Sequence, residues 1–174
     1  MRGIYAGSYD PPTNGHRWMF EQGMKLFDKF FIAVGENAHK AYSFTLNERV
    51  EMIKELCIGH QNVEVVTIEN KFLVKYAESV GANYIFRGIR NEGDYAYERG
   101  MRYVNSNINN DIQTIFMMSP RDLVEVSSSM VKGLVGADCW EEVIKQYVPE
   151  PVYKRMLKKF GHQRTRPRSL KKAL

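Results

Sequence analysis

The sequence predicts an α/β fold, a single Rossmann-like doubly wound domain with a five-stranded parallel sheet and C-terminal helices. Five short runs rich in β-branched and aromatic residues alternate with longer stretches of helical spacing. The chain has 174 residues, of which 44% are hydrophobic, so it can bury the core of one domain. We expect one domain over residues 1–160 and a basic, disordered tail over residues 161–174.

The expected strands are residues 3–5, 30–34, 63–68, 83–86 and 114–118. The first helix is expected to begin at the loop that ends in Gly15 and His16. The second begins after Thr45, which lies three residues before Glu48, a spacing typical of a capping box. The stretch "DYAYERGMRYVNSNI" has helical spacing, and residues 140–146 and 151–160 are expected to be helices joined at "VPEP".

The charge of the chain is unevenly distributed. The net charge is +5, but residues 151–174 hold nine Lys/Arg and no Asp/Glu, which leaves 16 Lys/Arg against 20 Asp/Glu, a balance of −4. Charge therefore does not define the main site, and we expect no nucleic-acid partner for the body of the protein. The basic end is either a solvated extension or an arm that binds polyanions, and the sequence leaves both open.

Other composition signals exclude several classes of protein. Cys57 and Cys139 lie far apart without metal-ligand spacing, so we expect neither a disulfide scaffold nor a zinc cluster. His39, His60 and His162 also lack ligand-like spacing, and no metal site is predicted. Without a signal segment or an apolar run of about 20 residues, the expectation is a soluble cytoplasmic protein with no membrane partner.

Four of the expected strands end in chemically distinctive loops. They read "GSYDPPTNGH", "ENAHK", "RGIRNEGDY" and "SPRDLVEVSSSM". In a doubly wound sheet the ligand lies outside the carboxyl ends of the strands, where these loops gather. Glycine amides, serine hydroxyls, lysine and arginine all bind phosphate, so the sequence predicts a polyphosphate ligand.

These loops also carry a family resemblance. "GSYDPPTNGH" resembles the T/HxGH signature of nucleotidyltransferases, with Thr13 in its first position and Gly15-His16 in its last two. "VSSSMVK" resembles their second signature, with Lys132 as its basic residue. "FRGIRNEGDYAYE", "KAYSFTLNERV" and "VSSSMVKGLVG" are similar to the bacterial phosphopantetheine adenylyltransferase family, in register from residue 2 to about residue 157.

The resemblance implies that ATP and 4′-phosphopantetheine react to give dephospho-coenzyme A and pyrophosphate. The nucleophile is a phosphate oxygen that is already anionic, so the protein must supply donors and cations instead of a general base. His16 at a helix N-terminus suits such a donor. The resemblance further implies Mg²⁺ carried on ATP, coenzyme A as a feedback ligand and assembly into a homohexamer.

Individual site residues follow from the same resemblance. It implies three catalytic residues, His16, Lys40 and Arg90. It implies that ATP is bound by Ser8, Tyr9, His16, Gly88, Ile89, Arg90, Glu98, Leu123, Val124, Glu125, Val126, Ser127, Ser128 and Ser129. It implies that phosphopantetheine is bound by Ser8, Lys40, Leu73 and Arg87.

Simpler roles exist for each of these residues taken alone. A histidine or a serine run at a helix start is commonly a cap, an exposed arginine is commonly an ion-pair partner, and Glu98 could pair with Arg102 one helical turn away. Two other functions also stay open. One is a sibling transferase that moves AMP or CMP onto another phosphorylated acceptor, and the other is a non-catalytic nucleotide or RNA binder that uses the basic tail.

Overall fold

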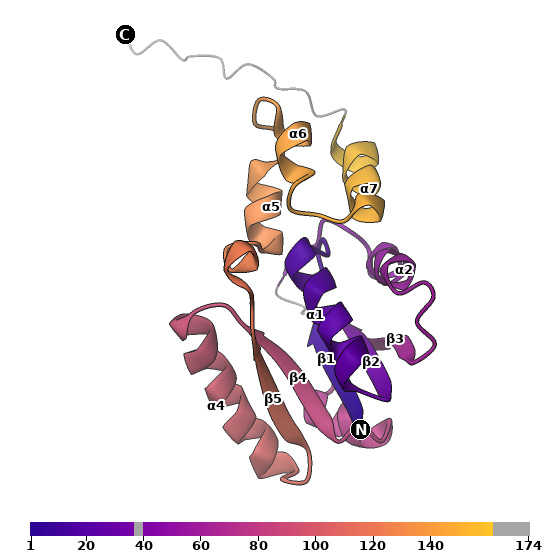
Figure 1. Ribbon diagram of the computed structural model, residues 1–174, viewed down its shortest axis with the longest axis vertical. Helices are drawn as coiled ribbons and strands as arrows, with labels where there is room; N and C mark the ends of the chain where they lie inside the picture. The colour runs from indigo at the N-terminus through magenta and orange to yellow at the C-terminus, as the bar shows by residue number, and fades with distance from the viewer. Residues whose placement is uncertain (37–39, 162–174) are drawn as a thin grey trace.

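The computed structural model describes residues 1–36 and 40–161, and it contains the predicted parallel sheet. The strands are β1 (Arg2–Gly7), β2 (Lys29–Gly35), β3 (Val63–Ile68), β4 (Tyr84–Ile89) and β5 (Gln113–Met118). All neighbours pair in parallel in the order β3-β2-β1-β4-β5 (Figure 1). From β1 the sheet grows in one direction through β2 and β3 and in the other direction through β4 and β5. Sheets of this kind bind ligands at this switch point, between β1 and β4.

Helices cover both faces of this sheet. One face carries α1 (Asn14–Leu26) and α2 (Leu46–Leu56), and the other carries α3 (Leu73–Ser79) and α4 (Glu92–Ile108). Successive strand residues alternate between the two cores, so that Tyr5 packs on the first face and Ile4 on the second. Both faces are buried, as expected for a parallel sheet.

Threonines fix the starts of α1 and α2. The hydroxyl of Thr45 accepts from the backbone N–H of Glu48, whose carboxylate accepts from the backbone N–H of Thr45, which confirms the predicted capping box. Thr13 caps α1 in the same reciprocal manner with His16 as its partner. The helix that presents His16 therefore begins at a defined residue.

Three further helices lie beyond the carboxyl ends of the strands (Figure 1). After the turn η1 (Arg121–Leu123) come α5 (Ser128–Leu134), α6 (Trp140–Ile144) and α7 (Glu150–Phe160). They enclose a third core around Trp140, Val152 and Phe44, the last of which precedes α2. The helix predicted at residues 140–146 ends at Ile144, and α7 begins with Pro at its first turn, where a missing N–H costs nothing.

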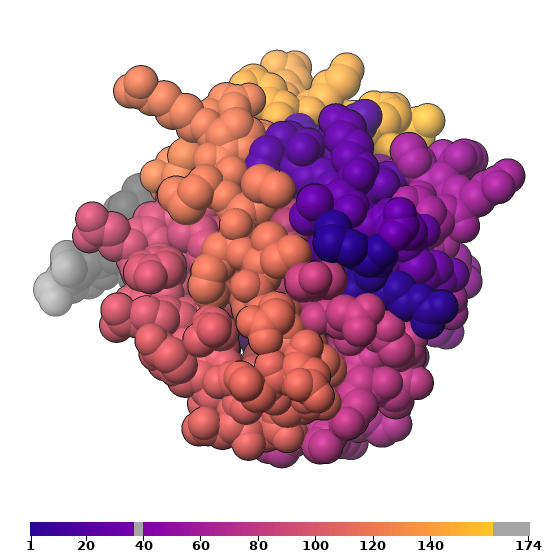
Figure 2. Space-filling model, turned by 60° about the horizontal axis from the view of Figure 1, so that its bottom comes forward, coloured from indigo at the N-terminus to yellow at the C-terminus, as the bar shows by residue number. Residues whose placement is uncertain are grey.

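Segments distant in sequence share one surface. In the space-filling view the orange segment around β5 lies between the pink surface of α4 and the indigo surface of the N-terminal residues (Figure 2). Among the described residues, no helix is both long and apolar enough to cross a bilayer. The predicted tail, apart from Gly161, lies outside the described residues, as do His39 and His162.

Candidate active site

A polar cleft of about 550 Å³ opens at the carboxyl ends of β1 and β4. Residues of the first loop, β4, α4 and the start of α5 surround it, together with the segment that follows β2. The predicted site residues that line it are Ser8, Tyr9, His16, Lys40, Arg87, Gly88, Arg90, Glu98, Ser127, Ser128 and Ser129. The structure thus brings the four predicted loops together around one space.

His16 stands at the third position of α1 with its ring held in one orientation. The backbone N–H of Thr13 donates to Nδ1 over 3.0 Å, so the ring proton resides on Nε2. Burial, followed by the positive charge of Arg90, lowers the pKa of His16 from 6.5 to about 4. At neutral pH the imidazole is therefore uncharged and can donate through Nε2, and His16 is one of the residues that line the cleft.

The ring of Tyr9 packs against the ring of His16. The two rings meet edge to face with centroids 5.1 Å apart, and the Tyr9 hydroxyl donates to the carbonyl of Tyr5 over 3.0 Å. Tyr9 has φ of 50°, a conformation uncommon outside glycine, and a Cβ at Gly7 would come within 2.8 Å of the Tyr9 ring. Tyr9 lines the cleft although the residue is only 1% exposed, and its predicted contact with ATP stays a prediction.

Two arginines line the cleft, one on β4 and one directly after it. Each forms an ion pair with an acidic residue of α4. Arg87 donates to both carboxylate oxygens of Glu98 and, over 2.7 Å, to the carbonyl of Ala6. Arg90 forms a two-pronged pair with Asp94, with distances of 2.8 and 3.1 Å. Glu98 therefore pairs with Arg87 and not with Arg102, and it is a buried residue that lines the cleft.

The serine turn reaches the cleft at the start of α5. Ser127 caps this helix by accepting from the backbone N–H of Met130, and the Ser128 hydroxyl donates to the carbonyl of Pro11 over 2.8 Å. One turn later Lys132 forms an ion pair of 2.9 Å with Asp10 of the first loop. Helix capping by Ser127 is thus real, and it places Ser128 and Ser129 at the cleft.

Lys40 and Leu73 line different cavities. Lys40 is exposed at the polar cleft, whereas Leu73 lines two neighbouring cavities of about 500 and 130 Å³. The larger of these shares Ser8 with the polar cleft, and the smaller shares Arg87 and Glu98 with it. A ligand with a phosphate and an elongated arm could occupy the cleft and one cavity together.

Five predicted nucleotide ligands do not line the cleft. Ile89 is 2% exposed and lies at the end of β4. The others are Leu123, Val124, Glu125 and Val126, which form the turn before α5. Backbone carbonyls of this turn approach Gly15, where an added Cβ would lie 3.5 Å from the carbonyl oxygen of Val126. Their predicted contact with adenine stays a prediction.

Two cleft residues, Asp10 and Asp94, escaped the sequence reasoning, and Lys132 was recognised only as part of a signature. Asp10, Asp94 and Lys132 line the cleft and each engages an oppositely charged partner there. The position of Asp94 four residues after Arg90 was a visible signal for an ion pair on one helical turn. Asp10 and Lys132 are 122 residues apart, and only the fold brings them together.

The carboxylates at this cleft are poor candidates for a protein-held metal ion. Asp10 is paired with Lys132, Asp94 with Arg90, and Glu98 with Arg87. Within residues 1–36 and 40–161, no group of three or more His, Cys, Asp or Glu side chains has the geometry of a metal site. The donors, hydroxyls and cations that remain suit an anionic ligand such as a polyphosphate.

Comparison with solved structures supports the fold. A Plasmodium falciparum nicotinic acid mononucleotide adenylyltransferase complexed with NaAD superimposes with a TM-score of 0.65 at 14% identity, covering 90% of this chain and 94% of that one. Thermotoga maritima TmcAL bound with alpha-thio ATP gives a TM-score of 0.69 at 12% identity, covering 92% and 56%. At such identities the likeness shows the fold alone.

Comparison with known sequences shows the family. The cytidylyltransferase-like family model matches residues 4–134. A phosphopantetheine adenylyltransferase of Chromobacterium violaceum is 53% identical over 162 residues, covering 93% of this chain and 99% of the relative. Another, from Streptococcus gordonii, is 34% identical over 154 residues, covering 88% and 92%. With its cleft, its signatures and these relatives in agreement, the chain belongs to the phosphopantetheine adenylyltransferase family of nucleotidyltransferases.

Proposed function

We propose that this protein transfers an adenylyl group from ATP to 4′-phosphopantetheine and releases pyrophosphate. The observation that carries the proposal is His16, a neutral ring whose Nδ1 accepts from Thr13, which leaves Nε2–H as its donor, in a cleft lined by cations and serines. Family membership supports the two substrates. The product is dephospho-coenzyme A, an intermediate of coenzyme A synthesis.

In this reaction an oxygen of the acceptor phosphate attacks the α-phosphorus of ATP. A P–O bond forms there, and the bond from the α-phosphorus to the bridging oxygen of pyrophosphate breaks. Because both reactants are anionic, the protein contributes alignment and charge stabilisation. Nε2–H of His16 donates to the α-phosphate as charge builds, while Arg90 and the serines at the start of α5 hold the β- and γ-phosphates.

The two parts of the acceptor would bind to different surfaces, its phosphate to charged and polar residues and its arm to apolar ones. Lys40 and Ser8, which both line the cleft, would hold the acceptor phosphate, and Arg87 would add a fixed positive charge beside them. Arg87 already donates hydrogen bonds to Glu98 and to the Ala6 carbonyl. It would therefore attract the acceptor phosphate mainly by its positive charge. The arm of the acceptor would run past Leu73 into a neighbouring cavity.

Magnesium enters this scheme as part of the substrate. Mg²⁺ binds triphosphate oxygens and retains several waters, so it needs few protein ligands. The ion-paired state of Asp10, Asp94 and Glu98 supports delivery as MgATP. Coenzyme A as a feedback ligand and a homohexameric assembly stay predictions from the family.

The decisive experiment is pyrophosphate release measured with Mg²⁺, each of the four nucleoside triphosphates in turn, and a panel of acceptor phosphates. We expect release that requires both ATP and 4′-phosphopantetheine. Preference for CTP or for another acceptor would establish the sibling transferase instead. Tight nucleotide binding without release from any pair would establish a non-catalytic binder.

A further inference from the structure

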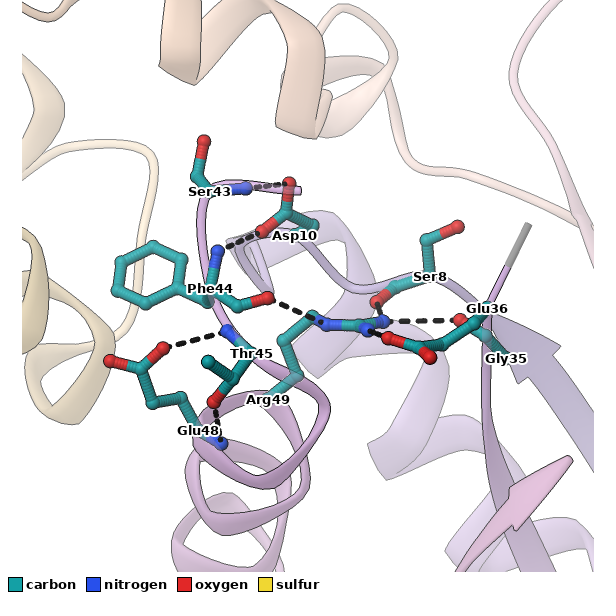
Figure 3. A network of polar contacts seen from close by, with 9 residues as sticks. All are labelled: Ser8, Asp10, Gly35, Glu36, Ser43, Phe44, Thr45, Glu48 and Arg49. Carbon is teal, nitrogen blue, oxygen red and sulfur yellow. Dashed lines mark hydrogen bonds and ion pairs between the residues drawn. The ribbon is translucent and has the colours of Figure 1, made fainter. Parts of the chain in front are cut away.

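Arg49 of α2 is buried completely, and its guanidinium joins three separate parts of the chain (Figure 3). Nη1 donates to the carbonyl of Ser8 over 2.7 Å and to that of Gly35 over 3.1 Å. Nη2 donates to the Glu36 carboxylate over 2.7 Å, and Nε donates to the carbonyl of Phe44 over 3.2 Å. One side chain thus ties the first loop to the end of β2 and to the start of α2.

Stability alone is a poor reason for this arrangement. Taking a guanidinium out of water carries a large desolvation cost, and well-packed apolar side chains often replace buried charges without loss of stability. The anionic partner of Arg49, Glu36, is 45% exposed, so the ion pair is only partly shielded. What Arg49 does that an apolar residue cannot do is fix several backbone carbonyls in one place.

Asp10 completes the same network from the first loop. Its carboxylate accepts from the backbone N–H groups of Ser43 and Phe44 over 2.9 and 2.8 Å, and it also pairs with Lys132 (Figure 3 shows the backbone contacts). Phe44 is therefore held at its N–H by Asp10 and at its carbonyl by Arg49. Both anchors connect it to the loop that carries Ser8.

The segment held in this way is the one that carries Lys40. Lys40 lies four residues before Phe44, and the ring of Tyr42 between them stacks on the Arg49 guanidinium at 4.2 Å. Arg49 itself does not line the cleft, whereas Ser8, Lys40 and Tyr42 all do. Its influence on the site must therefore pass through these residues.

We propose that Arg49 is a positioning residue that holds the Lys40 segment in register with the Ser8 loop for the transfer step. This inference rests on the proposed function, because the alignment it explains is that of the acceptor phosphate with ATP. Lost alignment slows the reaction more than it weakens ATP binding, since Arg90 and the serine turn lie on other elements.

The test is Arg49→Lys, which keeps the positive charge but loses the planar fork. We expect kcat to fall by about tenfold or more while KM for ATP changes by less than about twofold. In a Lys40→Ala background the same substitution should lower kcat by less than about twofold, because the group it positions is gone. Arg155→Lys is the matched control, since Arg155 joins α7 to Glu55 of α2 away from the cleft, and kcat should not change.

Two further measurements distinguish a failure of the positioning proposal from a folding defect and from a failure of the proposed function. Amide hydrogen exchange at Ser43 and Phe44 should speed up in Arg49→Lys, and this readout needs no catalysis. If Arg49→Lys does not fold, Glu36→Gln loosens the same guanidinium from an exposed position and should lower kcat in the same direction. Equal losses with and without Lys40, or unchanged exchange, would overturn the proposal. Absence of transfer by the unaltered protein would instead overturn the proposed function, while exchange would still decide the role of Arg49.

Discussion

At the scale of single residues, His16 is the group on which the proposed chemistry depends. We expect His16→Ala to lower kcat by about a hundredfold, as removal of one transition-state donor does, with ATP binding nearly intact. The fold should survive because Thr13 can still accept from the backbone N–H of residue 16. His60→Ala, on the exposed turn after α2, is the control. Turnover within a few-fold of the unaltered protein would remove His16 from the mechanism.

The lowered pKa of His16 also predicts how the folded state responds to acid. The pKa is 6.5 in the unfolded chain and about 4 in the folded one, so the unfolded chain binds the proton more readily. The stability associated with the neutral ring is therefore complete above pH 6.5 and declines as pH falls from 6.5 toward 4. In urea unfolding without ligand, the advantage of the unaltered protein over His16→Gln should be larger at pH 7.5 than at pH 5. An advantage independent of pH would contradict the assigned pKa.

The types of residue at the site could be predicted, but their partners could not. The composition of the loops predicts hydrogen-bond donors and cations for a phosphate ligand, because glycine, serine, lysine and arginine commonly bind phosphate. Nothing local says that Arg87 is held by Glu98, eleven residues away, or that Asp10 meets Lys132. The inward orientation of Tyr9 depends on a positive φ, which its residue type does not indicate.

At the scale of elements, periodicity predicted the strands, and the capping box at Thr45 predicted the start of α2. The expected strand at residues 83–86 continues to Ile89, because Arg87 and Gly88 still pair with Phe116 and Met117 of β5. A charged residue and a glycine end an apolar run in the sequence without ending a strand whose neighbours continue. This extension is functional, since it places Arg87 and Gly88 at the cleft.

The order of the elements explains why so many loops act together. All five strands are parallel, so every loop after a strand emerges at the same edge of the sheet. The C-terminal helices are tied to the same end of the sheet. Asn14 at the start of α1 donates to the carbonyls of Gln146 and Tyr147, which precede α7. Helical spacing predicted these helices, but this contact across more than 130 residues is a property of the packed fold.

At the scale of the whole molecule, α4 and β5 expose large apolar side chains. Tyr95, Tyr97, Tyr103 and Val104 on α4 and Met118 on β5 are between 43% and 66% exposed. Such a patch suits a subunit interface, in line with the predicted hexamer. At micromolar concentration, light scattering should give a mass several times 20.2 kDa.

The double variant Tyr103→Asp with Val104→Asp should reduce this mass, because neither residue lines the cleft or its neighbouring cavities. Ile58→Asp is the matched control, since Ile58 is a 78% exposed apolar residue on the turn after α2. A monomer of 20.2 kDa for the unaltered protein would exclude the assembly.

The basic C-terminal end tests whether charge or the cleft defines the function. Removal of residues 162–174, which lie outside the described part of the structure, deletes five of the 25 Lys/Arg and no acidic residue. Because the predicted site residues all precede this segment, the rate of adenylyl transfer to a small acceptor should be nearly unchanged. Any binding of the full-length protein to RNA should weaken steeply with added salt, and the truncated protein should bind little, since counterion release requires those charges. Transfer and RNA binding should be measured in parallel. Loss of transfer with the fold and the assembly preserved would mean that the tail contributes to an active site, and the catalytic body would then not be separable from its basic end.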